Sequence, residues 1–161
     1  MADSIEVDRR LETDTHKHKQ YCILVLIGLP ASGKTRFVSG LVDFEATRAS
    51  DRDDASSFDI IHVCYDKLIP LEKQKELATI DSDRESWKAC RKSIAKAVQS
   101  FIVDGVDDDD DKLSIDDELV KKCVQDFRRQ VVGDKKRTLL VIDDNNYFQS
   151  MRYEYYQSAR N

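Results

Sequence analysis

The chain has 161 residues, of which 40% are hydrophobic and 35% are charged, and its formal net charge is -5 at pH 7. This length and balance fit one globular domain with a core, and the negative charge argues against broad nonspecific nucleic-acid binding by the whole surface. No apolar signal region opens the chain, and its longest apolar run, 22–29, is far too short to span a membrane, so we expect a cytoplasmic protein with no membrane partner.

The apolar pattern predicts an α/β fold. Residues 1–20 are polar and lack apolar periodicity, which is typical of a mobile tail. In chain order we expect a strand at 21–27, a helix at 35–45, a strand at 59–64, two helices within 82–105 and 114–133, a strand at 138–142 and a helix at 148–160. Strands separated by helices indicate right-handed crossovers and a parallel sheet, whose ligands bind beyond the carboxyl ends of the strands.

A phosphate-binding loop follows the first predicted strand. Residues 28–35 read Gly-Leu-Pro-Ala-Ser-Gly-Lys-Thr and match G-x-x-x-x-G-K-[ST] between a strand and a helix. The glycines let the backbone approach a phosphate, and successive N–H groups with the following helix dipole favour an anion. Lys34 is expected to reach the β- and γ-phosphates, and Thr35 to bind Mg²⁺. The expected nucleotide-binding residues are Gly28, Ala31, Ser32, Gly33, Lys34 and Thr35.

Two aspartates follow the last predicted strand. Four apolar residues run into Asp143 and Asp144, which is the form of a Walker B strand that presents a carboxylate to Mg²⁺. The alternative is a strand followed by an Asx turn, and the phosphate loop in the same chain favours the metal role. The pattern leaves open which of the two carboxylates meets the metal.

Two further charged residues are candidates for the acceptor side. Asp66 follows the second predicted strand, where its carboxylate is placed either to accept a proton from an acceptor hydroxyl or to cap a helix or turn. Arg152 on the last helix is a candidate phosphate or RNA contact, and without further information a surface salt bridge is the preferred interpretation. No guanine-reading [NT]-K-x-D motif is visible, which favours ATP.

The cysteines and histidines show no metal-binding pattern. The cysteines at 22, 64, 90 and 123 are widely spaced and form no C-x-x-C pair, so we expect reduced, packed thiols rather than disulfides or metal ligands. The histidines at 16, 18 and 62 lack a metal-ligand context, and His62 is expected to be packed or half-exposed on its strand.

Three segments together resemble the L-seryl-tRNA(Sec) kinase family. They are the loop at 28–35, Tyr-Asp-x-x-Ile-Pro at 65–70 and Asp-Asp-Asn-Asn-Tyr-Phe-Gln-Ser-Met-Arg-Tyr-Glu at 143–154. The related Elongator-associated P-loop protein family shares Gly-x-Pro-x-Ser-Gly-Lys and Arg-Tyr, but the paired aspartates and Ser-Met fit the seryl-tRNA kinase better. The resemblance implies a P-loop kinase domain over 21–161 and phosphorylation of the serine on tRNA(Sec) with ATP and Mg²⁺.

The resemblance also implies residue roles. Lys34 and Thr35 would hold ATP and magnesium, Asp66 would engage the serine hydroxyl, and Asp143 or Asp144 would take the Walker B role. Asn146 departs from the family, which commonly has a bulkier residue there, and we expect the change to be tolerated.

The resemblance covers only the N-terminal part of the family. The family continues into further strands, an arginine-bearing lid and a helical tRNA-binding region, so we expect a truncated sheet with the strand at 21–27 on an exposed edge. Such a chain is expected to bind ATP better than it turns ATP over. A nucleotide-binding accessory factor in tRNA modification, without kinase activity, is the alternative function.

Overall fold

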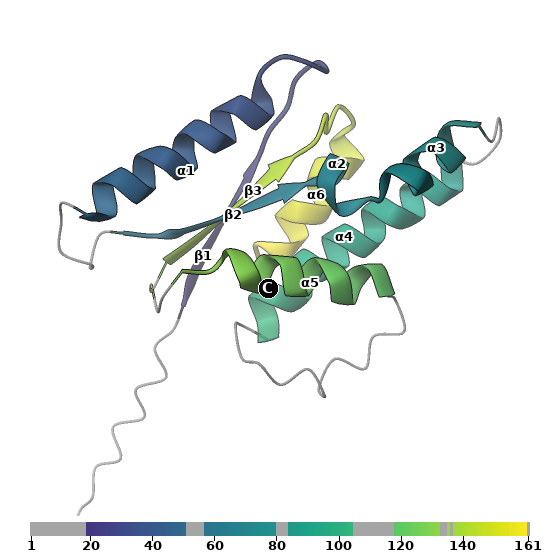
Figure 1. Ribbon diagram of the computed structural model, residues 1–161. Helices are drawn as coiled ribbons and strands as arrows, with labels where there is room; N and C mark the ends of the chain where they lie inside the picture. Colours follow the sequence, from purple (N-terminus) through teal and green to yellow (C-terminus); the bar gives the residue numbers. More distant parts are fainter. Residues whose placement is uncertain are drawn as a thin grey trace, which may run out of the picture.

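A computed structural model describes residues 19–50, 57–79, 84–104, 118–132, 135 and 137–160. The predicted tail therefore lies almost entirely outside the described residues. The described part is an α/β fold with an all-parallel sheet of three strands flanked by helices (Figure 1).

The sheet has the order β1-β3-β2, with β1 at Gln20–Val25, β2 at Asp59–Cys64 and β3 at Arg137–Asp143. β3 is the central strand and pairs in parallel with both neighbours. Its Ile142 lies opposite Val25 of β1 and Val63 of β2. All three carboxyl ends therefore meet at one edge of the sheet, where the loop at 28–35 begins and where Asp66 and Asp143 lie.

Helices cover both faces of the sheet (Figure 1). On one face α1, Lys34–Ser50, packs on β2 and β3. On the other face α4, Arg84–Asp104, packs on α5, Glu118–Gln130, and on α6, Gln149–Ser158. The first connection runs from β1 past β3 to β2, and the second runs in the opposite direction, from β2 back to β3. If both connections are right-handed, their helices must lie on opposite faces of the sheet.

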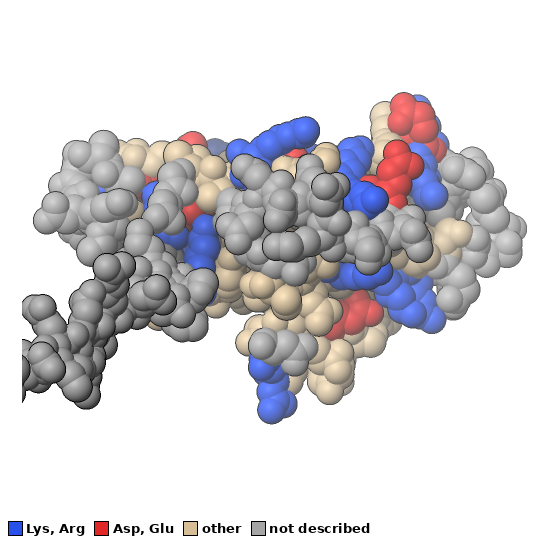
Figure 2. All heavy atoms as spheres, turned by 90° about the horizontal axis from the view of Figure 1, so that it is seen from below, with Lys and Arg blue, Asp and Glu red and all other residues tan. Residues whose placement is uncertain are grey.

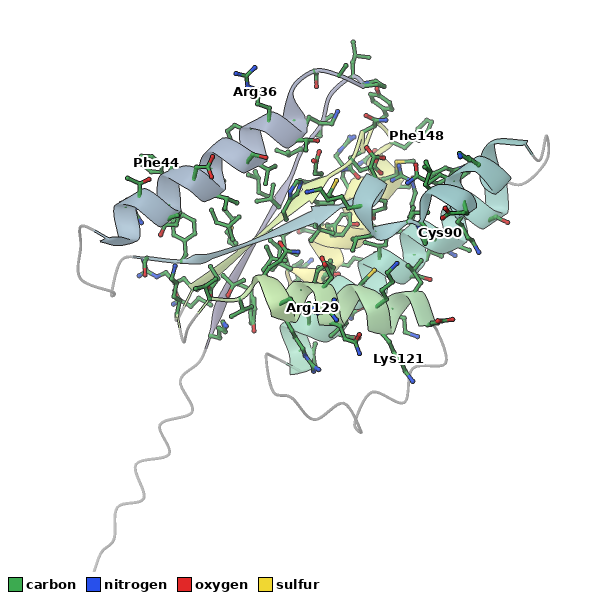
Figure 3. All side chains as sticks on the ribbon, in the orientation of Figure 1. Arg36, Phe44, Cys90, Lys121, Arg129 and Phe148 are labelled. Carbon is green, nitrogen blue, oxygen red and sulfur yellow. The ribbon has the colours of Figure 1, made fainter. Side chains whose placement is uncertain are left out.

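The main hydrophobic core lies between the sheet and the α4, α5 and α6 layer. Phe101 of α4 and Phe127 of α5 are fully buried and meet edge to face, with ring centroids 5.9 Å apart. Inward residues of β2 and β3 complete this core, namely Ile61, Val63, Leu140 and Ile142. Less apolar surface is buried between α1 and the sheet. Phe37 and Phe44 of α1 remain exposed, and Phe44 is labelled in Figure 3.

The two edges of the sheet differ. The side chain of Gln130 in α5 accepts a hydrogen bond from the N–H of His62 at 2.8 Å and so covers the backbone of edge strand β2. Among the described residues, no strand pairs with the outer edge of β1. The expectation of an exposed edge at this strand is confirmed for that part of the chain, and an unpaired edge is a site of aggregation.

The sequence missed two helices between β2 and α4. They are α2, Tyr65–Leu68, and α3, Leu71–Thr79. α1 is also longer than the predicted helix at 35–45, since it runs from Lys34 to Ser50. None of the helices in the described part is both long enough and apolar enough to cross a membrane.

A buried tyrosine pair joins α2 to α6. The hydroxyls of Tyr65 and Tyr155 form a hydrogen bond, and both side chains are almost completely buried. Burial raises the pKa of each phenol above its ordinary value of 10.0. Both tyrosines are therefore neutral at physiological pH.

This pair predicts alkaline destabilisation. Above pH 10.0 the unfolded chain loses phenolic protons that the folded chain keeps, so the free energy of unfolding should fall as pH rises. Each phenol contributes up to about 1.4 kcal/mol per pH unit. Urea denaturation at several pH values checks this, with a Tyr65→Phe/Tyr155→Phe double variant as control. An equal loss of stability in the double variant would show that other groups are responsible.

Candidate phosphate-binding site

The loop at 28–35 turns sharply between β1 and α1. Gly33 has φ 89°, a conformation that favours glycine, and an added Cβ would meet no atom within 4 Å, so its constraint is conformational. At Gly28 the constraint is steric, because a Cβ there would lie 3.0 Å from Ser32 Oγ. Ala31 also has a positive φ, 59°, which costs about 1–2 kcal/mol for a residue with a Cβ.

The N-terminus of α1 faces the same loop. Its first helical bond runs from the N–H of Phe37 to the carbonyl of Gly33, at 2.9 Å. The N–H groups of residues 34–36 precede that bond, and such groups at a helix start favour an anion together with the helix dipole. The N–H of Ser32 instead closes the turn by donating to Leu29, at 3.2 Å.

Lys34 lies over the loop. Its ammonium donates to the carbonyls of Gly28 and Leu29, at 3.1 and 2.8 Å, and to Oδ1 of Asn145, at 3.2 Å. Three oxygen partners hold the positive charge above the concavity of the loop. A phosphate oxygen there would replace them with charge-assisted hydrogen bonds.

Asp143 is the carboxylate that meets the loop. Its Oδ2 accepts a hydrogen bond from Thr35 Oγ1 at 2.7 Å and lies 2.8 Å from Nε2 of His62. A hydroxyl and a carboxylate in contact form an all-oxygen donor set of the kind that Mg²⁺ prefers, so Thr35 and Asp143 fit a magnesium site. The strand position of Asp143, at the end of central β3, holds it in place.

Asp144 points elsewhere. Its side chain forms an ion pair with Arg91 of α4, whose guanidinium lies over the ring of Tyr65 with its central carbon 5.2 Å from the ring centroid. Its Oδ1 also accepts a hydrogen bond from the N–H of Asn145 at 2.7 Å. The geometry therefore favours Asp143 over Asp144 as the carboxylate that would hold a metal together with Thr35.

A pocket of about 420 Å³ brings most of the predicted site residues together, although Gly28 is not among the residues that line it. Its lining includes Ala31, Ser32, Gly33, Lys34, Thr35, Asp66, Asp143 and Asp144. Asp66 is exposed and belongs to the first turn of α2, where Cys64 rather than Asp66 occupies the N-cap position. Asp66 therefore lines the same pocket as the loop at 28–35.

Arg152 does not line this pocket. Its guanidinium donates to the carbonyls of Asn146 and Tyr147, at 2.9 and 2.7 Å. These bonds tie α6 to the loop after β3. The sequence suggested either a phosphate or RNA contact or a surface salt bridge for Arg152, and the observed bonds to backbone carbonyls are neither. The geometry gives no support for a substrate role of Arg152.

Asn146 connects the ends of two strands. Its side chain is fully buried, and its amide donates to the carbonyls of Leu26 and Asp144, at 3.1 and 3.3 Å. Its φ of 45° is positive, which asparagine tolerates better than most residues. The residue that departs from the family pattern is thus a structural part of the loop beneath the site.

We expect Asn146→Ala to lower the free energy of unfolding by about 1–3 kcal/mol, because two partly buried carbonyls lose their donor. Asn146→Gly should cost about 1 kcal/mol less than the alanine variant, because glycine adopts a positive φ freely. Chemical denaturation of both variants measures the difference. Equal stabilities for the two variants would contradict a backbone constraint at this position.

Sequence reasoning missed Arg91, His62 and Asn146. His62 and Asp143 lie 81 positions apart, so only the strand register brings them into contact. Arg91 is one of several basic residues on α4, and its sequence context does not distinguish it from the others. Asn146 offered a weak signal, because asparagine after a strand is typical of a left-handed turn.

Comparison of the chain with protein-family models, with curated proteins and with solved structures finds no match. The functional interpretation therefore depends on the site geometry and on the sequence motifs.

Proposed function

We propose that the chain is an ATP-dependent kinase of the L-seryl-tRNA(Sec) kinase type. In this proposal the γ-phosphate of Mg²⁺-bound ATP passes to the serine hydroxyl of seryl-tRNA(Sec). A bond forms between the serine oxygen and the γ-phosphorus, the bond from that phosphorus to the bridging oxygen of ADP breaks, and Asp66 receives the hydroxyl proton. The products are O-phosphoseryl-tRNA(Sec) and ADP.

The contact between Thr35 Oγ1 and Asp143 Oδ2, at 2.7 Å, is the observation that carries this proposal. In P-loop enzymes the loop hydroxyl and the Walker B carboxylate hold one magnesium ion, which supplies charge stabilisation for the transferring phosphoryl group. Lys34 binds and orients the phosphates from the same side. These residues come from two segments that lie more than 100 positions apart, which makes a chance match to the loop pattern a poor explanation.

The acceptor side supports a kinase rather than a simple nucleotide switch. Asp66 lies in the same pocket as the loop and is exposed, so an acceptor hydroxyl has access to it. General-base assistance of this kind is worth about 10²–10⁴ in rate. The choice of seryl-tRNA(Sec) as acceptor comes from the sequence resemblance.

The surface charge fits a partner that binds at a restricted area. In the view of Figure 2, Lys and Arg side chains are interspersed with acidic and uncharged residues and form no continuous basic band. Exposed cations on α5 include Lys121, Lys122 and Arg129.

The test is phosphoryl transfer itself. The protein is incubated with γ-labelled ATP, Mg²⁺ and seryl-tRNA(Sec), and phosphoserine is measured after mild hydrolysis of the ester. We expect label on serine from tRNA(Sec) and much less from seryl-tRNA(Ser). ATP binding without transfer to either tRNA would contradict the kinase proposal.

That outcome would support a second candidate, a nucleotide-binding accessory factor in tRNA modification. One observation favours it. Transfer requires cations around the γ-phosphate, yet neither Arg91 nor Arg152 lines the pocket. Arg91 is paired with Asp144, and Arg152 donates to backbone carbonyls. Arg36 is the one arginine among the described residues that line the pocket, and Figure 3 shows it directed away from the sheet.

A further inference from the structure

Three potential metal ligands of different chemistry lie together beside the phosphate-binding site. His62 and Cys64 are two positions apart on β2, so their side chains point to the same face of the sheet. Asp143 of β3 lies opposite Cys64 in the strand register. One ligand atom from each residue lies within 4.8 Å of the other two.

The burial of this cluster is unusual for polar groups. Cys64 and Asp143 are 3% and 5% exposed, and the His62 side chain is 12% exposed. Burial raises the pKa of the Cys64 thiol, and the charges of Asp143 and Asp66 raise it further, while backbone N–H groups lower it. A bound divalent cation reverses this balance, because coordination deprotonates a thiol.

The donor set suits a soft or borderline cation. Zn²⁺ binds imidazole nitrogen, thiolate sulfur and carboxylate oxygen at about 2.0–2.3 Å, which places tetrahedral ligand atoms about 3.4 Å apart. At present His62 Nε2 and Asp143 Oδ2 are 2.8 Å apart, and all three ligand atoms lie within 4.8 Å of one another. Side-chain shifts of about 1 Å would bring all three to a common zinc ion. Mg²⁺ disfavours thiolate ligands, so this is not a second magnesium site.

An entry path is present. His62 and Cys64 line a hollow of about 480 Å³ between α1, β2 and α5, while Asp143 lines the phosphate-loop pocket. The cluster therefore stands between the two cavities. The Asp143 oxygen that faces His62 is the same Oδ2 that accepts the hydrogen bond from Thr35.

We propose that His62, Cys64 and Asp143 form a binding site for Zn²⁺, and that its occupation withdraws Asp143 from Thr35. The thiol proton passes to solvent, and the hollow leaves a coordination position open to water. Because Asp143 then binds zinc, it is no longer available beside Thr35 as a ligand for the Mg²⁺–nucleotide complex. This revises the expectation from the sequence that Cys64 and His62 have no metal-binding role.

The site is tested by titrating the full chain with Co²⁺, as a spectroscopic probe, and with Zn²⁺ against a chromophoric chelator. We expect one tight zinc equivalent and a sulfur-to-cobalt charge-transfer absorption. Cys64→Ser should abolish that absorption, and His62→Asn should weaken zinc binding at least tenfold. Circular dichroism confirms that each variant is folded. A wild-type chain without the charge-transfer absorption would overturn the proposal whatever the variants do.

Two controls separate this site from other ligands in the chain. Cys22→Ser removes the exposed thiol of β1, and His16→Asn/His18→Asn removes the paired histidines near the N-terminus. Both controls should retain the tight zinc equivalent, and its loss in either would overturn the assignment. The zinc titration is independent of nucleotide, so failure of the proposed kinase function leaves it interpretable.

Competition is measured separately as ATP affinity in excess Mg²⁺, with and without one equivalent of Zn²⁺. We expect zinc to weaken ATP binding at least tenfold in the wild type and to have little effect in Cys64→Ser. Unchanged ATP affinity in zinc-loaded wild-type protein would overturn the coupling between the two sites.

Discussion

Asp143→Asn should weaken Mg²⁺-dependent ATP binding and reduce phosphoryl transfer by about a hundredfold or more. Asp143 is the carboxylate in contact with Thr35, and the amide replaces a negative charge beside the metal with a neutral dipole. Loss of partners around a metal typically lowers affinity or activity by about 10–100-fold, and a residue next to the metal lies at the upper end of that range. Isothermal titration with ATP at several Mg²⁺ concentrations measures the effect.

Asp144→Asn is the matched comparison. Asp144 pairs with Arg91 rather than with Thr35. The main effect of Asp144→Asn should therefore be a lower free energy of unfolding, and its effect on the Mg²⁺ dependence of ATP binding should be smaller. Breaking a largely buried ion pair from one side costs up to about 3–5 kcal/mol because the remaining charge is left unpaired. The assignment of Asp143 would be wrong if Asp144→Asn lost the Mg²⁺ dependence of ATP binding while Asp143→Asn kept it.

Asp66→Asn should stop transfer and spare ATP binding. The asparagine keeps the size of the side chain but cannot take the proton of an acceptor hydroxyl, and removal of a general base lowers a rate by about 10²–10⁴. In the proposed mechanism Asp66 acts on the acceptor hydroxyl and not on the nucleotide, so the dissociation constant for Mg²⁺–ATP should change by less than about threefold. Single-turnover transfer to seryl-tRNA(Sec) and ATP titration are measured on the same preparation.

Glu72→Gln supplies the control for this substitution. Glu72 is an exposed acid in the first turn of α3, close to Asp66 in sequence and absent from the lining of the phosphate-loop pocket. Its neutralisation should leave both transfer and ATP binding unchanged. If Asp66→Asn behaved like Glu72→Gln, Asp66 would not be the base, and a role in the turn would remain.

The strands and the convergence of site residues could be predicted from the sequence. Near-continuous apolar runs, which are typical of strands in a parallel sheet, gave the positions of β1, β2 and β3 to within two residues. Once the sheet is parallel, the loop, Asp66 and Asp143 must meet at one edge. The two helices α2 and α3 were missed because one is only four residues long and the other begins after Pro70 with a highly charged sequence.

The details that distinguish similar residues could not be predicted. Successive residues at a strand end point to opposite faces, so Asp143 reaches Thr35 on the α1 side while Asp144 reaches Arg91 on the α4 side. The sequence gives no register between β2 and β3, and hence no reason to place His62 beside Asp143. Arg152 was considered for its charge alone, and its actual partners are backbone carbonyls that no side-chain pattern reveals.

We propose that residues 28–35 bind the phosphates of ATP together with magnesium. Equilibrium binding of Mg²⁺–ATP to the wild type and to Lys34→Ala tests this. We predict saturable binding by the wild type and a loss of about 10–150-fold in the variant, the equivalent of one charge-assisted hydrogen-bond group at about 1.5–3 kcal/mol. Lys121→Ala, on the exposed face of α5, should bind as the wild type does. A folded wild-type chain that does not bind ATP, or a Lys34→Ala variant that binds ATP equally well, would show that residues 28–35 do not form an ATP-binding loop of this kind.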